Sequence, residues 1–253
     1  MVLDPVAGIG TCSMRWTHRR KTLPYVAGTI SKGFLIGGTS IGIRAGCRKE
    51  PACENVRGAR MIDKLLLGNF RFRETDFTPN IDYYRELASS QHPETLWIGC
   101  SDSRLQTGHI TQARAGELFI QRNIGNIVPV HDWNFATVLE YAVVHLKVSD
   151  VVICGHSNCG AIRALDKESS DAYIPLWLNN AREAKVRVDN RITPPRTVPE
   201  AEERHKLIEQ ENVRLQIEHL YTYPLLKKAT DEKRIEVHGL YYDLGTGELK
   251  KIA

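Results

Sequence analysis

The chain has 253 residues, of which 42% are hydrophobic and 25% charged, ordinary proportions for a globular protein with a sizeable core. Its net charge of +4 arises in residues 1–60, which hold ten Lys and Arg against three Asp and Glu, whereas residues 61–253 hold 24 against 27. Because the body has no basic excess and the sequence has no apolar run long enough to span a bilayer, we expect no nucleic-acid partner and no membrane association.

Residues 1–60 form an N-terminal extension that is poor in acidic residues and contains the basic stretch "MRWTHRRK". This composition is typical of a transit segment, but a start-site artefact would explain it equally well, because Met61 opens a convincing helix. We expect the extension to be poorly ordered, and its Cys47 and Cys53 are too far apart for a tight metal knuckle. Six cysteines do not make a disulfide scaffold, so we expect a reducing compartment. The expected location is cytoplasmic, or organellar if the extension is a transit segment.

From Met61 onward, helix and strand patterns alternate along the chain. An amphipathic helix begins with "MIDKLLLGNFRF", and apolar runs of strand length follow at 95–100, 117–123, 150–156 and 234–244. Helical periodicity covers 133–146, about 172–188 and about 202–222. The stretch "DLGTGELKKI" indicates a turn into a last short strand that could pair antiparallel at an edge. The sequence therefore predicts an α/β domain over 61–253, with a mostly parallel central β-sheet flanked by helices.

Two short motifs, "CSDSR" at 100–104 and "GHSNCG" at 155–160, each follow a predicted strand. Ligands of open α/β sheets collect at the carboxyl ends of the strands, so the two motifs should converge there. Cys100, His156 and Cys159 would then offer two thiolates and an imidazole, which suits Zn²⁺ and leaves one tetrahedral position open for catalysis. Asp102 is the candidate for that fourth position, and Arg104 could pull its carboxylate away through a bidentate pair.

Simpler interpretations apply to these residues taken singly. Cys100 alone would be a small buried hydrophobe, and a single H-x-x-C spacing arises by chance. A structural zinc site usually recruits a second close pair of ligands, but here Asp102 and Arg104 stand in that place. The other cysteine and histidines near the strands are assigned to the core or the surface: Cys154, His109, His145 and His238.

The motifs C-x-D-x-R and H-x-x-C-G, in this order and spacing, resemble those of the β-class carbonic anhydrases. The stretches "GELFIQRNIGN", "LEYAVVHLKV" and "ENVRLQIEHLYTYP" are similar to the same family, so the resemblance covers residues 61–252. It implies a lyase that reversibly hydrates carbon dioxide to bicarbonate and a proton by zinc-bound hydroxide. It also implies that Cys100, His156 and Cys159 bind zinc, while Asp102 and Arg104 form a catalytic dyad that gates the metal. Asp102 would bind zinc in the closed state only.

The resemblance implies two further sites, whose residues would otherwise be interpreted as core or loop positions. Gln91 would hydrogen-bond the substrate from the neighbouring subunit, which implies a homodimer or homotetramer. The apolar pocket for carbon dioxide would be lined by Phe119, Ile124 and Tyr141. A regulatory bicarbonate that favours the closed state would be held by Trp97, Arg122 and Tyr242.

Other functions remain open at this point. A related hydrolase of carbonyl sulfide or carbon disulfide would use the same metal ligands. A non-catalytic zinc-binding protein could keep the fold, although it would need neither Asp102 nor Arg104. A thiol redox protein is the weakest alternative, because the sequence has no C-x-x-C.

Overall fold

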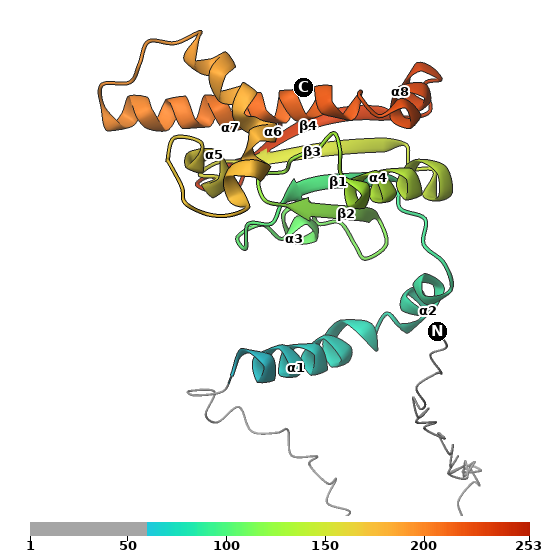
Figure 1. Ribbon diagram of the computed structural model, residues 1–253. Coiled ribbons are helices and arrows are strands. Elements are labelled where there is room, and N and C mark those ends of the chain that lie inside the picture. The colour runs from blue at the N-terminus through green and yellow to red at the C-terminus, as the bar shows by residue number, and fades with distance from the viewer. Residues whose placement is uncertain (1–59) are drawn as a thin grey trace, which may run out of the picture. The chain divides into compact units, whose positions relative to one another are not determined.

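A five-stranded sheet forms the centre of the fold in the computed structural model, which describes residues 60–253 (Figure 1). The expectations for residues 1–59, including Cys47 and Cys53, fall outside the described residues. The strands are β1 (Thr95–Cys100), β2 (Leu118–Asn123), β3 (Asp150–His156), β4 (Glu236–Tyr242) and β5 (Leu249–Lys251). Their spatial order is β2-β1-β3-β4-β5, with all neighbours parallel except the pair β4 and β5. The predicted fold class, including the antiparallel edge strand, is confirmed.

Helices precede, connect and flank the strands. They are α1 (Met61–Phe72), η1 (Arg73–Phe77), α2 (Ile81–Ser89), α3 (Thr107–Thr111), α4 (Trp133–Glu140), η2 (Tyr141–Leu146), α5 (Gly160–Ala164), α6 (Ile174–Asp189), α7 (Val198–Leu220) and α8 (Pro224–Asp231), where η marks π-helical turns. Periodicity located α1, α4 with η2, α6 and most of α7. It does not reveal α2, α3, α5 and α8, because helices of five to nine residues complete only about one and a half to two and a half turns.

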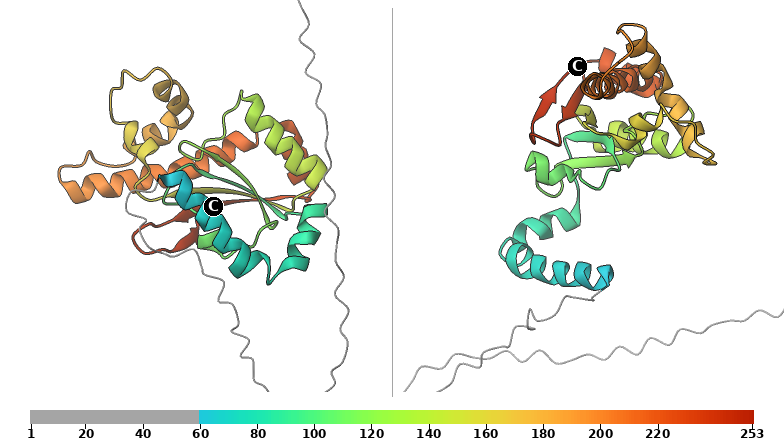
Figure 2. Two further views of the ribbon diagram at one scale, coloured as in Figure 1. Left: turned by 90° about the horizontal axis from the view of Figure 1, so that it is seen from below. Right: turned by 90° about the vertical axis from the view of Figure 1, so that its left-hand side faces the viewer.

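Helix α7 begins at Val198, four residues before the predicted start. The Thr197 hydroxyl caps it by accepting a hydrogen bond from the Glu200 N–H, and Pro199 fits the first turn, where its missing N–H costs nothing. This first turn does not face the core, Val198 being 76% exposed, so a hydrophobic pattern could not reveal it. The extra turn lengthens the helix that packs on β3 and β4 (Figures 1 and 2).

The strand order places a topological switch point between β1 and β3. From β1 the chain crosses to β2 on one side, and from β3 it continues to β4 on the other side. The loops that follow β1 and β3 therefore diverge and leave a crevice at the carboxyl ends of these two strands. Both predicted motifs follow these two strands, Cys100 being the last residue of β1 and His156 the last residue of β3.

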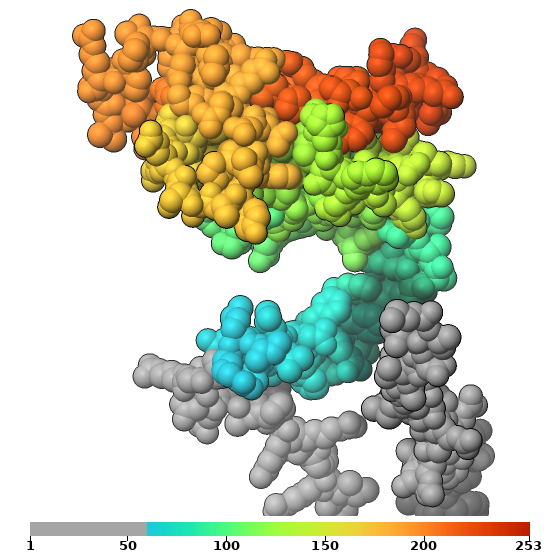
Figure 3. Space-filling view, in the orientation of Figure 1, coloured from blue at the N-terminus to red at the C-terminus, as the bar shows by residue number. Residues whose placement is uncertain are grey.

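Two large groups of buried apolar side chains, and a third small one, hold the described part of the fold together. The first lies between the sheet and the helices α4, η2, α7 and α8, and includes Leu96, Ile153, Phe135 and Val213. The second joins α5, α6 and α7 around the carboxyl end of β1, where Cys100 and Cys159 belong to it. In the space-filling view of Figure 3, the atoms of this part of the chain (yellow to orange) form a continuous surface. The two motifs are thus built against a packed support.

Two strand glycines allow α7 to approach the sheet closely. A Cβ atom at Gly155 would lie 2.6 Å from Cγ2 of Val213, and one at Gly239 would lie 2.9 Å from Cγ1 of the same residue. The two methyl groups of Val213 therefore occupy the hollows that these glycines leave on adjacent strands. Because Gly155 precedes His156, this contact seats α7 directly behind one of the candidate metal ligands.

Helix α1 has the amphipathic pattern expected from the sequence, yet none of its residues is buried. Several of its apolar residues are more than half exposed, among them Met61, Leu65 and Leu66 at 68%, 57% and 65%. Within residues 60–253, no helix combines the length and the apolar character needed to cross a membrane.

Candidate metal centre

The three predicted metal ligands meet at the carboxyl edge of the sheet. Strands β1 and β3 are parallel neighbours, so their last residues, Cys100 and His156, lie at the same edge. Cys159 follows in the loop after β3 and stands at the amino end of α5. The two sulfur atoms and a ring nitrogen lie within 4.8 Å of one another, and the three residues are only 5%, 1% and 1% exposed. The arrangement expected from the spacing is present.

The His156 ring has the orientation of a metal ligand. Its Nδ1 lies 2.9 Å from the Ser157 carbonyl oxygen, which can only accept, so Nδ1 carries the proton. Nε2 is consequently an acceptor, and this buried atom has no hydrogen-bond partner among the described residues. A buried polar atom without a partner costs about 1–3 kcal/mol, which coordination of a cation would offset. The donor set fits zinc, and a carbonyl fixing the second ring nitrogen is the usual support for a histidine ligand.

The two thiols are electrostatically coupled. The hydrogen bond from the Cys159 thiol lowers the pKa of Cys100 to about 4 against the opposing effect of burial, and the backbone N–H of Gly125 also donates to the Cys100 sulfur. The same contact with Cys100, together with burial, raises the pKa of Cys159. The pair therefore shares one proton that a divalent cation would displace, as expected for a thiolate metal site.

The carboxylate of Asp102 is bound by Arg104. Oδ1 accepts hydrogen bonds from the Arg104 N–H and Nε at 3.0 and 2.9 Å, and Oδ2 accepts one from Nη2 at 2.6 Å. These bonds to Arg104 hold the pKa of Asp102 well below its ordinary value. Arg104 Nη2 also donates to the Asn158 carbonyl at 3.0 Å, which ties the first motif to the second. Asp102 Oδ2 lies 4.0 Å from His156 Nε2, so the carboxylate borders the ligand group while paired with arginine.

Sequence reasoning missed a buried carboxylate next to the centre. Glu209 of α7 accepts a hydrogen bond from the Cys159 N–H at 2.9 Å and one from the Tyr241 hydroxyl at 2.7 Å. Burial raises the pKa of this carboxyl group, against the lowering effect of those two donors. The stretch "HKLIEQENV" holds two glutamates, and no sequence pattern indicated which of them would turn inward toward the metal loop.

Comparison with known proteins identifies the family. The carbonic anhydrase family model matches residues 95–249. Carbonic anhydrase 1 of Escherichia coli O157:H7 is 38% identical over 194 residues, which cover 74% of this chain and 86% of that protein. The chain belongs to the β-class carbonic anhydrases. Among solved structures, a tetrameric β-carbonic anhydrase from Sordaria macrospora has a TM-score of 0.69 at 35% identity, covering 76% of this chain and 96% of that one. The Coccomyxa β-carbonic anhydrase in complex with acetazolamide has a TM-score of 0.70 at 30% identity, covering 77% and 87%.

The predicted enzyme class is thereby confirmed for this β-carbonic anhydrase. Three of its predicted pocket residues, Phe119, Tyr141 and Gln91, lie away from the candidate metal centre of their own chain. Phe119 pairs in register with Leu96 near the start of the strands. Leu96 precedes Cys100 by four residues on β1, a separation along the strand of about 13 Å at 3.3 Å per residue. The Tyr141 ring packs beside Phe119, with ring centroids 5.8 Å apart. Gln91 is exposed and precedes β1, at the same amino end of the sheet.

Ile124 occupies a different place from the other predicted pocket residues. It directly follows β2, at the carboxyl end where the predicted metal ligands lie, and its side chain is half exposed. Its carbonyl accepts a hydrogen bond from Trp177 Nε1 at 2.8 Å, which ties this loop to α6. Of the four residues, only Ile124 thus lies at the metal edge of its own chain.

The three residues expected to bind a regulatory bicarbonate lie on three strands of this β-carbonic anhydrase, β1, β2 and β4. Trp97 and Tyr242 belong to one small apolar cluster with Cys154. Arg122 pairs in register with Gly99, two residues beyond Trp97. The Arg122 guanidinium donates to the carbonyl oxygens of Cys100 and Asp102 at 2.8 and 2.7 Å.

Cys154, His109 and His145 lie where the sequence led us to expect them, in the core or outside it, whereas His238 makes unexpected contacts. Cys154 is buried, and burial raises the pKa of its thiol to about 12, as expected for a core residue. His109 and His145 are not among the buried residues. His238 has partners that the sequence did not suggest, because it contacts Asp150 at 2.7 Å and Lys251 at 3.0 Å.

Proposed function

We propose that Cys100, His156 and Cys159 bind Zn²⁺ and that this centre catalyses the reversible hydration of carbon dioxide to bicarbonate and a proton. The observation that carries the proposal is the unpartnered, buried Nε2 of His156 beside two coupled thiols. When bound in such a site, zinc acts as a Lewis acid that lowers the pKa of water from 15.7 to about 7 and so supplies a nucleophile at neutral pH. Family membership supports the substrate and the reaction.

The chain's own residues would orient the reacting water. Asp102 is ionised because Arg104 holds its pKa low, so Oδ2 is a hydrogen-bond acceptor 4.0 Å from His156 Nε2. A water molecule beside that nitrogen would donate a hydrogen bond to Oδ2, which would direct a lone pair of the water away from the carboxylate. Arg104 keeps the acceptor in place through its two parallel hydrogen bonds and through its anchor on the Asn158 carbonyl.

The same carboxylate would close the site if it left Arg104. Asp102 is a residue type that binds zinc, and its competitor Arg104 has a side chain that is half exposed. We include in the proposal that bicarbonate, held by Trp97, Arg122 and Tyr242, favours this closed state. Arg122 supports that idea, because an anion that drew its guanidinium away would remove two donors from the carbonyls of Cys100 and Asp102.

A complete substrate pocket would require a second copy of the chain. Gln91, Phe119 and Tyr141 lie at the amino ends of the strands, whereas the metal ligands lie at the carboxyl ends. We propose a homodimer or homotetramer in which one subunit supplies these residues to the metal centre of its partner. The exposed apolar side of α1 supports an additional interface, and the similar Sordaria macrospora protein is tetrameric.

Metal analysis combined with two activity assays tests the proposal. Purified protein should contain stoichiometric zinc, hydrate carbon dioxide in a stopped-flow assay and sediment as an oligomer. Cys159→Ala should lose zinc and activity, whereas the matched variant Cys154→Ala should keep its zinc, because that buried thiol lies outside the ligand group. Release of hydrogen sulfide from carbonyl sulfide without hydration of carbon dioxide would favour the related hydrolase. Zinc without either activity would favour a non-catalytic protein.

A further inference from the structure

Glu209 is a carboxylate buried beside the metal loop, and its hydrogen bonds come from uncharged donors. It lies in the middle of α7 and is 3% exposed. Among the described residues, its side chain accepts from the Cys159 N–H and the Tyr241 hydroxyl. Burying a charged group without an ion pair is costly, so a residue of this kind is expected where its contacts serve a specific purpose.

The contact with Cys159 fixes the backbone that carries a metal ligand. Cys159 is the residue that precedes α5, and no side chain caps this helix. The residue before it, Asn158, has a left-handed backbone with φ of 56°, so the chain turns sharply immediately ahead of the ligand. The carboxylate of Glu209 holds the peptide N–H of Cys159 at this turn, and thereby sets the direction in which its Cα–Cβ bond points.

Tyr241 in turn orients the carboxylate. Its hydroxyl donates to Oε2 while the Cys159 N–H donates to Oε1, so the two oxygens have separate donors. Tyr241 is buried on β4, next to β3. A Cβ atom at Gly155 of β3 would lie 3.7 Å from Cδ2 of Tyr241 and 3.5 Å from the Glu209 carbonyl oxygen. The metal loop, α7 and β4 are therefore joined through one carboxylate.

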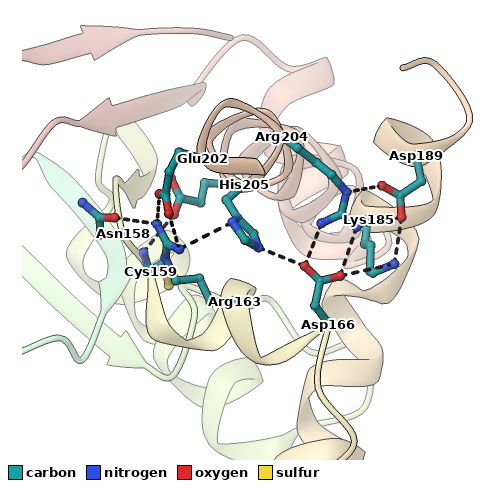
Figure 4. A network of polar contacts seen from close by, with 10 residues as sticks. Asn158, Cys159, Arg163, Asp166, Lys185, Asp189, Glu202, Arg204 and His205 are labelled. Carbon is teal, nitrogen blue, oxygen red and sulfur yellow. Dashed lines mark hydrogen bonds and ion pairs between the residues drawn. The ribbon is translucent and has the colours of Figure 1, made fainter. Parts of the chain in front are cut away.

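A second, outer contact holds the same loop less firmly. Arg163 donates to the Asn158 side chain at 2.7 Å and pairs with Glu202 of α7 (Figure 4). The side chains of Arg163 and Glu202 are 30% and 52% exposed, and such solvent-exposed pairs contribute little, at about 0–1 kcal/mol. The buried contact through Glu209 is therefore the one expected to control the position of Cys159.

We propose that Glu209 is a positioning residue that sets the geometry of Cys159 as a metal ligand through the length of its side chain rather than through its charge. This inference rests on the proposed zinc centre. Partners that orient a metal ligand typically contribute a factor of about 10–100 to metal affinity, and we expect a loss in that range when the contact is broken.

Two substitutions separate reach from charge. Glu209→Gln keeps the reach: its carbonyl oxygen can accept from the Cys159 N–H, and its amide can donate to the Tyr241 oxygen. Glu209→Asp keeps the charge but is one methylene shorter. Glu211→Asp is the matched control, because Glu211 is similarly buried on the same helix and its carboxylate pairs with Arg191 at 2.9 Å instead of contacting the metal loop.

Zinc affinity, measured by competition with a chromophoric chelator, is the primary readout, and the visible spectrum of the Co²⁺-substituted protein reports ligand geometry. We expect Glu209→Asp to lose about 10–100-fold in zinc affinity with an altered Co²⁺ spectrum, while Glu209→Gln stays near wild type. If Glu209→Asp binds zinc as tightly as Glu211→Asp, or if Glu209→Gln is the weaker variant, the positioning role is overturned.

Tyr241→Phe provides an independent test if Glu209→Asp does not fold. It removes one of the two donors that orient the carboxylate and keeps the aromatic ring in the core, so zinc affinity should fall with little change in circular dichroism. Unchanged affinity in this variant would also overturn the inference. Failure of the wild-type protein to bind zinc would instead refute the proposed metal centre, so the two failures are distinguishable.

Discussion

Gly155→Ala tests how closely α7 must approach the strand that carries His156. The new Cβ would lie 2.6 Å from Cγ2 of Val213, closer than real side chains pack. Val213 cannot turn away, because β-branched residues in helices have one strongly preferred rotamer and its other methyl group already fills the hollow at Gly239. We therefore expect the substitution to push α7 away from β3.

The expected magnitude follows from two opposing effects. The backbone of Gly155 is not in the left-handed region, so alanine would gain about 0.4–1 kcal/mol from the reduced entropy of the unfolded chain. Overpacking in a buried contact costs about 1–3 kcal/mol. The steric term is larger, so Gly155→Ala should lower the free energy of unfolding by about 1–2 kcal/mol.

A double-mutant cycle with Val213→Ala identifies the cause. Val213→Ala alone removes two buried methyl groups, each worth about 0.8 kcal/mol of transfer free energy, and leaves a cavity. In the double variant the methyl group introduced by Gly155→Ala occupies that space, so the two losses should not add, with a favourable coupling of about 1 kcal/mol or more in urea denaturation. Additive losses would refute the assignment. Glu209 lies one turn before Val213, so Gly155→Ala should also lower zinc affinity.

Three further predictions concern charges and the metal. Arg104→Lys cannot make the two parallel bonds to Asp102, so kcat/KM for carbon dioxide at neutral pH should fall about tenfold or more; an unchanged value would contradict the dyad. Hydrogen bonds from Arg204 lower the pKa of Asp166 to about 2, so its contribution to stability is present above its unfolded pKa and is lost as pH falls. The difference in thermal midpoint between wild type and Asp166→Asn should therefore shrink from about pH 4 to about pH 2, and a constant difference would contradict the ion pair. Chelation of zinc should lower the thermal midpoint by mass action, and an unchanged midpoint would contradict metal binding.

The sequence was most informative where chemistry is local. Cys100, Asp102 and Arg104 lie within five residues of one another, and His156 and Cys159 within four, so each motif could be interpreted before the fold was known. Apolar runs located the four parallel strands, most clearly β1 and β3, because strands buried on both sides are continuously hydrophobic. Short helices such as α3 and α5 offered too few residues for any periodicity to appear.

Residues whose role depends on packing between distant segments could not be predicted in the same way. Glu209 and Glu211 are equivalent in the sequence, and only the seating of α7 on Gly155 decides which carboxylate meets Cys159 and which meets Arg191. For Phe119, resemblance suggested a pocket role, but the parallel register places it far from the metal edge of its own chain. Such positions are fixed by tertiary contacts rather than by local pattern.

The two ends of the sheet therefore have different roles in this family member. The carboxyl ends of β1 and β3 carry the proposed metal ligands, which are rigidly supported because Cys100 and His156 are strand residues and Cys159 is held by α7. The amino ends carry aromatic residues that are only partly covered, including Tyr141, which is 43% exposed. In the proposed oligomer these side chains would be covered and would form the apolar wall of the partner's metal centre. Catalysis and assembly are therefore expected to depend on the same surface, so that a change at Tyr141 that weakens association should also lower the rate of hydration.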